Sequence, residues 1–304
     1  MSKWLERWQV PLYLAALLGG ALLGLLLPEK DNSFDKAINP ALILLLYATF
    51  LAVPFERIRE SIKDIRFVVT VLILNFLVVP LVVFILSRFV LFDRALLVGV
   101  LLVLLCPCVD YVMVFTRLAN GSWEKLLAVS PLLMLLQLAL LPLFLLAFAG
   151  GDIMESVQLE PFVQAFLLLI AMPLALSAVT QHLSQKFALA RGVMKALETA
   201  MVPLMAITLL VVAASQFSHI IPQIGLLLAA LPIYVAFLVI MPLLGNIAGR
   251  ISRQSARTRR ALAFSCSTRN SLVVLPLALA LPDSLSFAAV AVISLAEKGA
   301  RHEL

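Results

Sequence analysis

The chain has 304 residues, a mass of 33.2 kDa and a formal charge of +6; 63% of its residues are apolar and 13% are charged. Soluble domains are about 45–50% apolar and about 25% charged. This composition excludes an ordinary cytosolic enzyme, a disordered chain and a disulfide-stapled secreted domain. It predicts an all-α polytopic membrane protein in which residues 1–304 form a single transmembrane domain.

Ten apolar segments follow one another along the chain. A helix that spans a bilayer needs about 20 mainly apolar residues. The first nine segments are long enough, and the last is short or truncated. The segments cover residues 9–28, 38–55, 67–87, 95–118, 126–149, 161–181, 196–215, 223–247, 261–281 and 286–297. The sequence therefore predicts about ten transmembrane helices joined by short loops.

The positive charges predict the orientation of these helices. If the N-terminus is cytoplasmic, 18 of the 23 Lys and Arg residues lie on the cytoplasmic side and four lie outside. Cytoplasmic loops of membrane proteins carry an excess of Lys and Arg. We therefore expect a multi-pass protein with a cytoplasmic N-terminus, and we assign the net charge to its loops rather than to nucleic-acid binding.

The two halves of the chain are similar to each other. Pro40 corresponds to Pro203, and the run 105–110 in the fourth segment corresponds to the run 264–269 in the ninth. Five segments per half is an odd number, so the halves would have opposite orientations. Inverted repeats with interrupted helices near the midplane are typical of secondary transporters. The sequence predicts one repeat over about residues 1–150 and a second over about residues 151–304.

Asp110 and Arg269 lie well inside complete predicted spans, away from the span ends. A charge at the centre of a membrane helix costs about 2.5–3.5 kcal/mol, so it normally faces a cavity or a partner. Pro107 cannot donate a hydrogen bond to the carbonyl of Val103, and residues 265–271 are seven consecutive polar or small residues. Both spans should therefore break and expose main-chain groups that bind an ion or an anion. The alternative is a buried Asp110–Arg269 ion pair that only holds the halves together.

The cysteines inside the spans have competing interpretations. On an intact helix Cys106 and Cys108 would point about 200° apart and could not hold one ligand, whereas Cys106 and Asp110 would share a face. These cysteines, like Cys266, are also explained as small apolar residues. A thiol role therefore stays open beside simple packing.

Several other polar or small residues inside the spans favour helix packing. Gly20 and Gly24 have the spacing of a close helix–helix contact. Interhelical hydrogen bonds are expected from Asn75, Gln137, Gln164, Thr180, Thr208 and Ser215. The sequence lacks a Walker A loop, a His-Glu-x-x-His pattern and a nucleophile elbow. We therefore expect no enzyme activity, no ATP hydrolysis, no metal site and no cofactor apart from a coupling ion.

Four runs of residues resemble the bile acid:sodium symporter superfamily, and most closely its bacterial arsenic-resistance (arsenite permease) branch. The runs are Ile38–Ala41, Asn75–Leu81, Pro107–Val112 and Ser267–Leu277. The resemblance implies two inverted repeats of five helices, a panel domain and a core domain. It also implies that helices 4 and 9 are interrupted and cross, with substrate and coupling ions at the crossing.

The resemblance also implies roles for individual residues. In the arsenite branch a cysteine of helix 4 matters for substrate, and Cys108 lies in the matching motif, after the helix-breaking Pro107. The implied substrate-binding residues are Cys108, Arg269 and Asn270. The implied coupling-ion ligands are Asp110, Thr268, Asn270 and Ser271. The branch also uses an acid in helix 10, with which Glu297 does not convincingly align.

The predicted function is a secondary active transporter of the bacterial inner membrane. We expect proton-driven efflux of arsenite or a similar small oxyacid, an antiporter that confers arsenical resistance. One alternative is a sodium-coupled symporter of a bile acid-like or other organic anion. A second alternative, of a different class, is a non-transporting membrane receptor or assembly partner, which the short loops disfavour. The expected partners are a small-molecule or ion substrate and the lipid bilayer.

Overall fold

The computed structural model describes most of the chain as helices. The described residues are 3–26, 33–53, 64–106, 110–149, 163–164, 166–220, 224–269, 273–275 and 278. Five helices among them are long and apolar enough to cross a membrane. They cover Ile65–Val90, Trp123–Phe148, Leu167–Ser184, Ala188–Ser215 and Leu228–Ile251. Within the described residues the predicted all-helical fold is thus confirmed, whereas the short tenth segment lies outside them.

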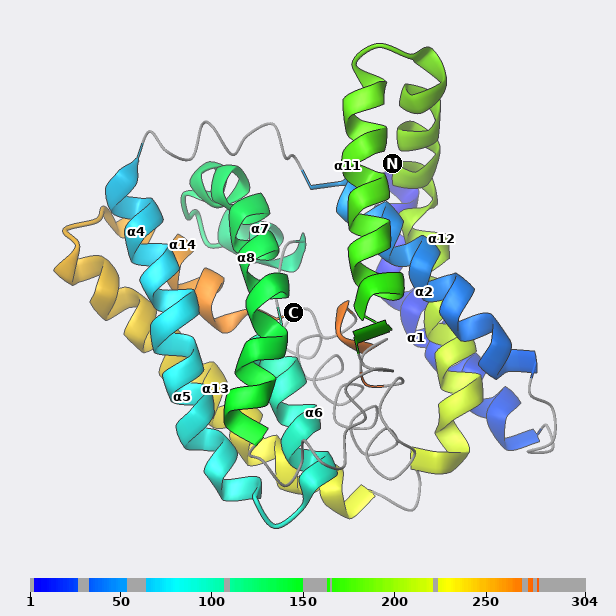
Figure 1. The fold of residues 1–304 in the computed structure, drawn as a ribbon, viewed down its shortest axis with the longest axis horizontal. Helices are drawn as coiled ribbons and strands as arrows, with labels where there is room; N and C mark the ends of the chain where they lie inside the picture. Colours follow the sequence, from blue (N-terminus) through cyan, green and yellow to red (C-terminus); the bar gives the residue numbers. More distant parts are fainter. Residues whose placement is uncertain are drawn as a thin grey trace. The chain divides into compact units, whose positions relative to one another are not determined.

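The chain divides into two compact units, one of residues 1–53 and 160–224 and the other of residues 54–159 and 225–304. The first unit holds α1 (Lys3–Leu26), α2 (Ser33–Leu51), η4 (Leu167–Ala171), α11 (Met172–Ser184) and α12 (Ala188–Ile220) (Figure 1). The second holds α4 (Ile65–Ile73), η2 (Leu74–Val78), α5 (Val79–Ser87), η3 (Arg88–Val90), α6 (Arg94–Leu105), α7 (Asp110–Leu118), α8 (Trp123–Ala149), α13 (Ile224–Ile251) and α14 (Ala256–Ser267). Each unit therefore combines a segment from before residue 150 with a segment from after it.

In the first unit, α12 packs along α1 and α2, and α11 packs against α2 (Figure 1). Gly20 and Gly24 bring α1 close to the backbone of α12. A Cβ added at Gly20 would lie 2.8 Å from the Cβ of Ala213, and one at Gly24 would lie 2.5 Å from the carbonyl oxygen of Ala214. The close contact predicted from the spacing of the two glycines is confirmed.

A neutral side chain caps the C-terminal end of α2. The last carbonyls of a helix have no partner within it. The amide Nε2 of Gln181, on α11, donates to the carbonyls of Phe50, Leu51 and Val53 at 3.3, 3.0 and 2.8 Å. The hydroxyl of neighbouring Thr180 lies 2.8 Å from Tyr47 Oη, which confirms an interhelical bond at Thr180. By contrast, Thr208 donates to Leu204 of its own helix.

In the second unit, the third predicted span is continuous but changes its winding. Residues Leu74–Val78 form a π-helical turn directly before Pro80, in which the N–H of Val79 reaches the carbonyl of Leu74. Proline lacks an N–H, so the regular ladder cannot continue through it. Asn75 lies in this turn and is 2% exposed. The wider turn therefore carries a buried amide, whose partners are described below.

Helix α6 lies in the interior of the second unit. All its residues from Ala95 to Leu105 are buried, and the carboxylate of Asp93 caps its start by accepting from the N–H of Leu96 at 2.8 Å. Nearby, Gly245 lets α13 approach α14 closely, because a Cβ there would lie 2.7 Å from the Cα of Ala263. The C-terminal ends of α6 and α14 are the features that build the candidate site.

Candidate binding site at two helix breaks

The fourth predicted span breaks after Leu105. Cys106 leaves the helix in an extended conformation, with φ −71° and ψ 153°, and a new helix, α7, begins at Asp110. The break predicted from Pro107 is therefore present. The expected shared face of Cys106 and Asp110 is wrong, because the two residues do not belong to one helix. Cys106 is fully buried and its thiol donates to the carbonyl of Val103 at 2.9 Å, as a packing residue would.

The ninth predicted span breaks in the same way after Ser267. Thr268 is extended, with φ −84° and ψ 135°, and its N–H reaches back to the carbonyl of Phe264 at 3.0 Å. Thr268 and Cys106 are thus both extended residues that directly follow the end of a helix. The polar run 265–271 had predicted this break, and the described part of the run confirms it.

Arg269 joins the two broken helices. Its Nε donates to the carbonyl of Leu104, near the end of α6, at 2.9 Å. Its Nη2 donates to the carbonyl of Cys266 on α14 at 3.0 Å, and its Nη1 to that of Thr268 at 3.2 Å. A cation is favourable at a helix C-terminus, which carries a partial negative charge. One guanidinium therefore stabilises the C-terminal ends of two helices at once.

Two buried amides complete these contacts. Asn75 donates through Nδ2 to Val71 O at 3.0 Å and to Ser265 Oγ at 3.1 Å, and its Oδ1 lies 3.5 Å from Arg269 Nη1. Gln137, on α8, donates to Leu105 O at 2.8 Å. The interhelical bonds predicted for both amides are confirmed. Their convergence on the two breaks is new, because no spacing in the sequence relates them to Arg269.

The predicted site residues differ in how far the structure describes them. Arg269 and Thr268 lie together at the end of α14. Asp110 is the first residue of α7, but its side chain is outside the described part of the chain. Also outside the described residues are Pro107, Cys108, Asn270, Ser271 and Glu297. Their binding roles, and the Asp110–Arg269 pair, therefore stay predictions.

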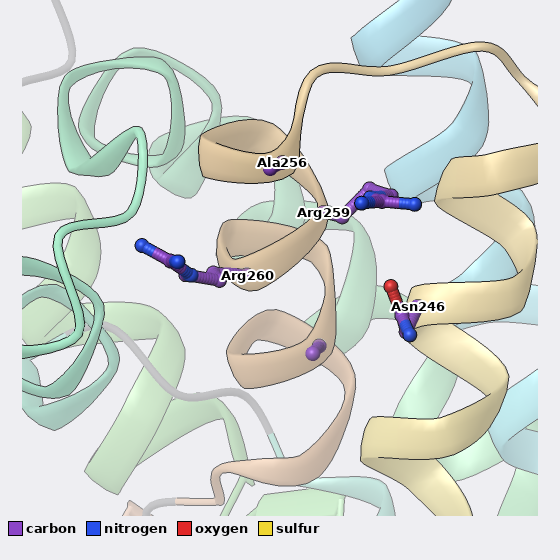
Figure 2. A pocket seen from close by; sticks show the side chains of 5 residues that line it. Asn246, Ala256, Arg259 and Arg260 are labelled. Atoms are coloured by element: carbon purple, nitrogen blue, oxygen red, sulfur yellow. The ribbon is translucent and has the colours of Figure 1, made fainter.

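A pocket lies toward the start of α14, away from the breaks. It is a pocket of about 290 Å³, lined by Asn246, Ala256, Arg259, Arg260 and Ala263. Figure 2 shows Arg259 pointing toward α13 and Arg260 pointing to the opposite side of α14. Arg260 donates to the carbonyls of Ala119 and Asn120 at 3.0 and 3.4 Å and is exposed. Helix α14 thus carries an exposed arginine near its start and a partly buried one just beyond its end.

The break after Leu105 lies in a part of the chain that matches the sequence model of a known protein family. The family described as Sodium Bile acid symporter family matches residues 39–238. The chain belongs to this family. The match includes α6 and its break, but it ends before α14, so Arg269 lies beyond the matched residues. No curated protein matches the chain.

Family membership confirms the predicted superfamily and a multi-pass membrane protein of a transporter family. Such a protein takes an ion or a small molecule as substrate. Within the described ranges, no group of three or more His, Cys, Asp or Glu residues could hold a metal ion. The polar atoms at the two breaks are main-chain carbonyls, amides and one guanidinium, which suit ion and anion binding.

Proposed function

We propose that this family member is a secondary active transporter that exports arsenite, or a similar small oxyacid, driven by the proton gradient across a bacterial inner membrane. The observation that carries the proposal is the meeting of two interrupted helices at Arg269. Discontinuous helices provide main-chain groups for substrates and ions in secondary transporters. The positive charges of the loops support a cytoplasmic N-terminus.

The cysteines support arsenite as the substrate. Trivalent arsenic is a soft centre, and thiolate sulfur is the soft ligand that a protein offers. Cys106 donates to the carbonyl of Val103, and Cys266 donates to that of Met241 at 3.2 Å; both are buried and have packing roles. Cys108 follows the break of α6 and lies in the motif that resembles the arsenite branch. We therefore assign the arsenic ligand to Cys108.

Proton coupling is assigned to Asp110, at the start of α7. A carboxylate inside a membrane protein exchanges a proton or binds a cation, and its cost in the bilayer makes a functional role the default. Thr268, Asn270 and Ser271 follow the second break in sequence and would supply further oxygen ligands. Arg269 and Asn270 would contact the substrate from the α14 side.

Arsenite counterflow into proteoliposomes tests this function. We expect flux in the unmodified chain and a strong loss in Cys108→Ser. Cys106→Ser and Cys266→Ser serve as matched controls and should transport normally when present at equal abundance. Unchanged flux in Cys108→Ser would contradict the thiol mechanism.

A second candidate is a sodium-coupled symporter of an organic anion. The family description and the positive charge of Arg269 favour it, because a guanidinium binds a carboxylate well. This candidate predicts uptake of an organic anion that needs sodium and does not depend on Cys108. A panel of bile acids and smaller carboxylates in the same proteoliposomes separates the two functions.

A further inference from the structure

The pocket at the start of α14 contains an arginine with a buried, unpartnered nitrogen. Arg259 lines this pocket of about 290 Å³ together with Asn246 of α13. Its Nε is buried and forms no hydrogen bond with the described part of the chain. Buried polar atoms are nearly always hydrogen-bonded, so this nitrogen is a candidate contact for a ligand.

The described residues around Arg259 leave its charge without a counterion. The ion pair found among them joins Lys125 to Asp64, at the starts of α8 and α4. The described residues that line the pocket include no acid. In addition, residues 250–260 hold five arginines and no Asp or Glu. The pocket therefore lies in a strongly basic part of the chain and attracts anions.

Two more groups at the pocket suit an anion. Figure 2 shows the amide of Asn246 in the space between α13 and α14, on the same side of α14 as Arg259. Ala256, the first residue of α14, also lines the pocket. The first N–H groups of a helix have no partner within it, and the positive end of the helix dipole favours an anion. Arg260 contributes less, because its guanidinium points to the opposite side and donates to Ala119 O at 3.0 Å.

The chemistry of these donors favours a phosphate group. A guanidinium presents its N–H groups in a planar fork that matches the oxygens of a phosphate. Small-ligand pockets measure about 300–1,000 Å³, so this pocket is at the lower end of the range and suits a compact group. Such a phosphate comes either from free solution or from the headgroup of a lipid.

The neighbouring surface of α13 favours the lipid. Positions 239, 243, 246 and 250 are separated by four, three and four residues, so they lie on one side of the helix. Val239 and Leu243 are each 58% exposed, and Arg250 is exposed as well. An exposed apolar stripe therefore leads along α13 to Asn246 and the pocket. The positive charges of the loops predict that this end faces the cytoplasm, and basic pockets between membrane helices on that side bind lipid headgroups.

We propose that the pocket between α13 and the start of α14 binds the phosphate group of an anionic membrane lipid. Arg259 donates to the phosphate oxygens and Asn246 to a further headgroup oxygen. An acyl chain lies along Val239 and Leu243. The bound lipid would hold the start of α14 against α13, away from the breaks and without contact with the transported substrate.

Thermal unfolding of the purified, delipidated full chain in detergent tests this proposal at constant ionic strength. The additions are phosphatidylglycerol, zwitterionic phosphatidylcholine or inorganic phosphate. Phosphatidylglycerol should raise the midpoint of the unmodified chain more than the other two, because a ligand that binds only the folded state stabilises it. In Arg259→Gln the apparent affinity for phosphatidylglycerol should fall about tenfold or more, the scale of one charge-assisted hydrogen bond. Arg257→Gln is the matched control, since Arg257 is an exposed arginine of the same helix turn that does not line the pocket.

Three results would overturn the proposal. The first is an unmodified chain that phosphatidylglycerol does not stabilise. The second is an equal loss of affinity in Arg259→Gln and Arg257→Gln, which would show general attraction to the basic loop. The third is a response to inorganic phosphate that depends on Arg259 without a response to phosphatidylglycerol, which would assign the pocket to a free anion. If Arg259→Gln does not fold, Asn246→Asp, which places a carboxylate at the pocket, replaces it, and an undiminished response to phosphatidylglycerol in that variant would overturn the proposal.

Discussion

The C-terminal end of α2 and those of α6 and α14 all need hydrogen-bond donors, but different kinds of side chain supply them. Each leaves main-chain carbonyls without helical partners in an apolar chain. At α2 the neutral amide of Gln181 donates to three carbonyls, whereas at α6 and α14 the charged Arg269 donates to the carbonyls of both helices. A neutral amide is thus enough to cap a helix. At the two breaks a charged group donates instead, and it serves two helices at once.

The largest expected loss of stability comes from removing the hydrogen-bond donors that Arg269 supplies to the two breaks. In sodium-free buffer, Arg269→Leu should lower the free energy of unfolding by about 3 kcal/mol or more, because each buried carbonyl left unpaired costs about 1–3 kcal/mol. Arg269→Gln should lose clearly less, since its amide still donates. Denaturant unfolding in detergent micelles measures both free energies. Equal losses in the two variants would show that hydrogen bonds from residue 269 do not stabilise the two helix ends.

The corresponding change in the first unit is Gln181→Leu. It removes the donor for Phe50, Leu51 and Val53 and should cost about 1–3 kcal/mol of unfolding free energy. Gln181→Arg is the informative control, because it keeps donors and adds a charge that suits a helix C-terminus. We expect Gln181→Arg to fold normally. A Gln181→Leu variant as stable as the unmodified chain would show that the end of α2 does not need this donor.

A smaller loss of stability is expected when Gln137 is replaced, because its amide donates to one carbonyl of α6, that of Leu105. Gln137→Leu should cost about 1 kcal/mol, the scale of single interhelical hydrogen bonds in membranes. Ser130→Ala is a matched control on the same helix, because Ser130 donates to Leu127 of its own helix. Its unfolding midpoint should stay near that of the unmodified chain. A larger loss in Ser130→Ala than in Gln137→Leu would contradict the account.

The smallest loss of stability is expected at the exposed start of α4. Asp64 caps the start of α4, and its hydrogen bond from Lys125 lowers the pKa of its carboxyl below the ordinary 3.8. A lowered pKa in the folded state gives stability that is present above about pH 3.8 and is lost as the pH falls further. Because the pair is 39% exposed on both sides, Asp64→Asn should cost at most about 1 kcal/mol at neutral pH. The gap between variant and unmodified chain should close in acid; a gap that widens would be inconsistent.

The sequence predicted the helical fold class and both breaks, because those features are local, and five of the expected membrane helices lie among the described residues. Pro107 and the polar run 265–271 mark the breaks directly, and Gly20 and Gly24 mark a close helix contact. The sequence could not predict which donors serve the freed carbonyls. Gln137 and Asn75 are distant from Arg269 along the chain, and only the packing of α8 and η2 against the breaks brings them together.

The cap of α2 escaped prediction for the same reason. Gln181 lies at the end of its apolar segment, where a polar residue is expected to face the membrane surface. Only the packing of α11 against α2 turns its amide to the carbonyls of Phe50, Leu51 and Val53. In the same way, a spacing of four residues would place Cys106 and Asp110 on one face of an intact helix, but α6 ends at Leu105 and Asp110 begins α7.

The buried ion pair considered from the sequence can be distinguished from a binding role by a double variant. If Asp110 and Arg269 only neutralise each other, Asp110→Asn with Arg269→Gln should restore both expression and transport. If they bind ions or substrate, the double variant should fold without transporting. Membrane abundance and arsenite flux of the two single variants and the double variant give the answer. Recovery of full transport would support the purely structural pair.

We propose that the two helix ends joined by Arg269 form the transport site. Arsenite counterflow in sodium-free proteoliposomes tests it most directly, with Arg269→Gln compared with Arg260→Gln at equal abundance. Both substitutions remove an arginine that donates to main-chain carbonyls, but only one acts at the breaks. The account predicts that Arg269→Gln loses most of its flux while Arg260→Gln transports like the unmodified chain. Equal flux in the two variants would contradict it.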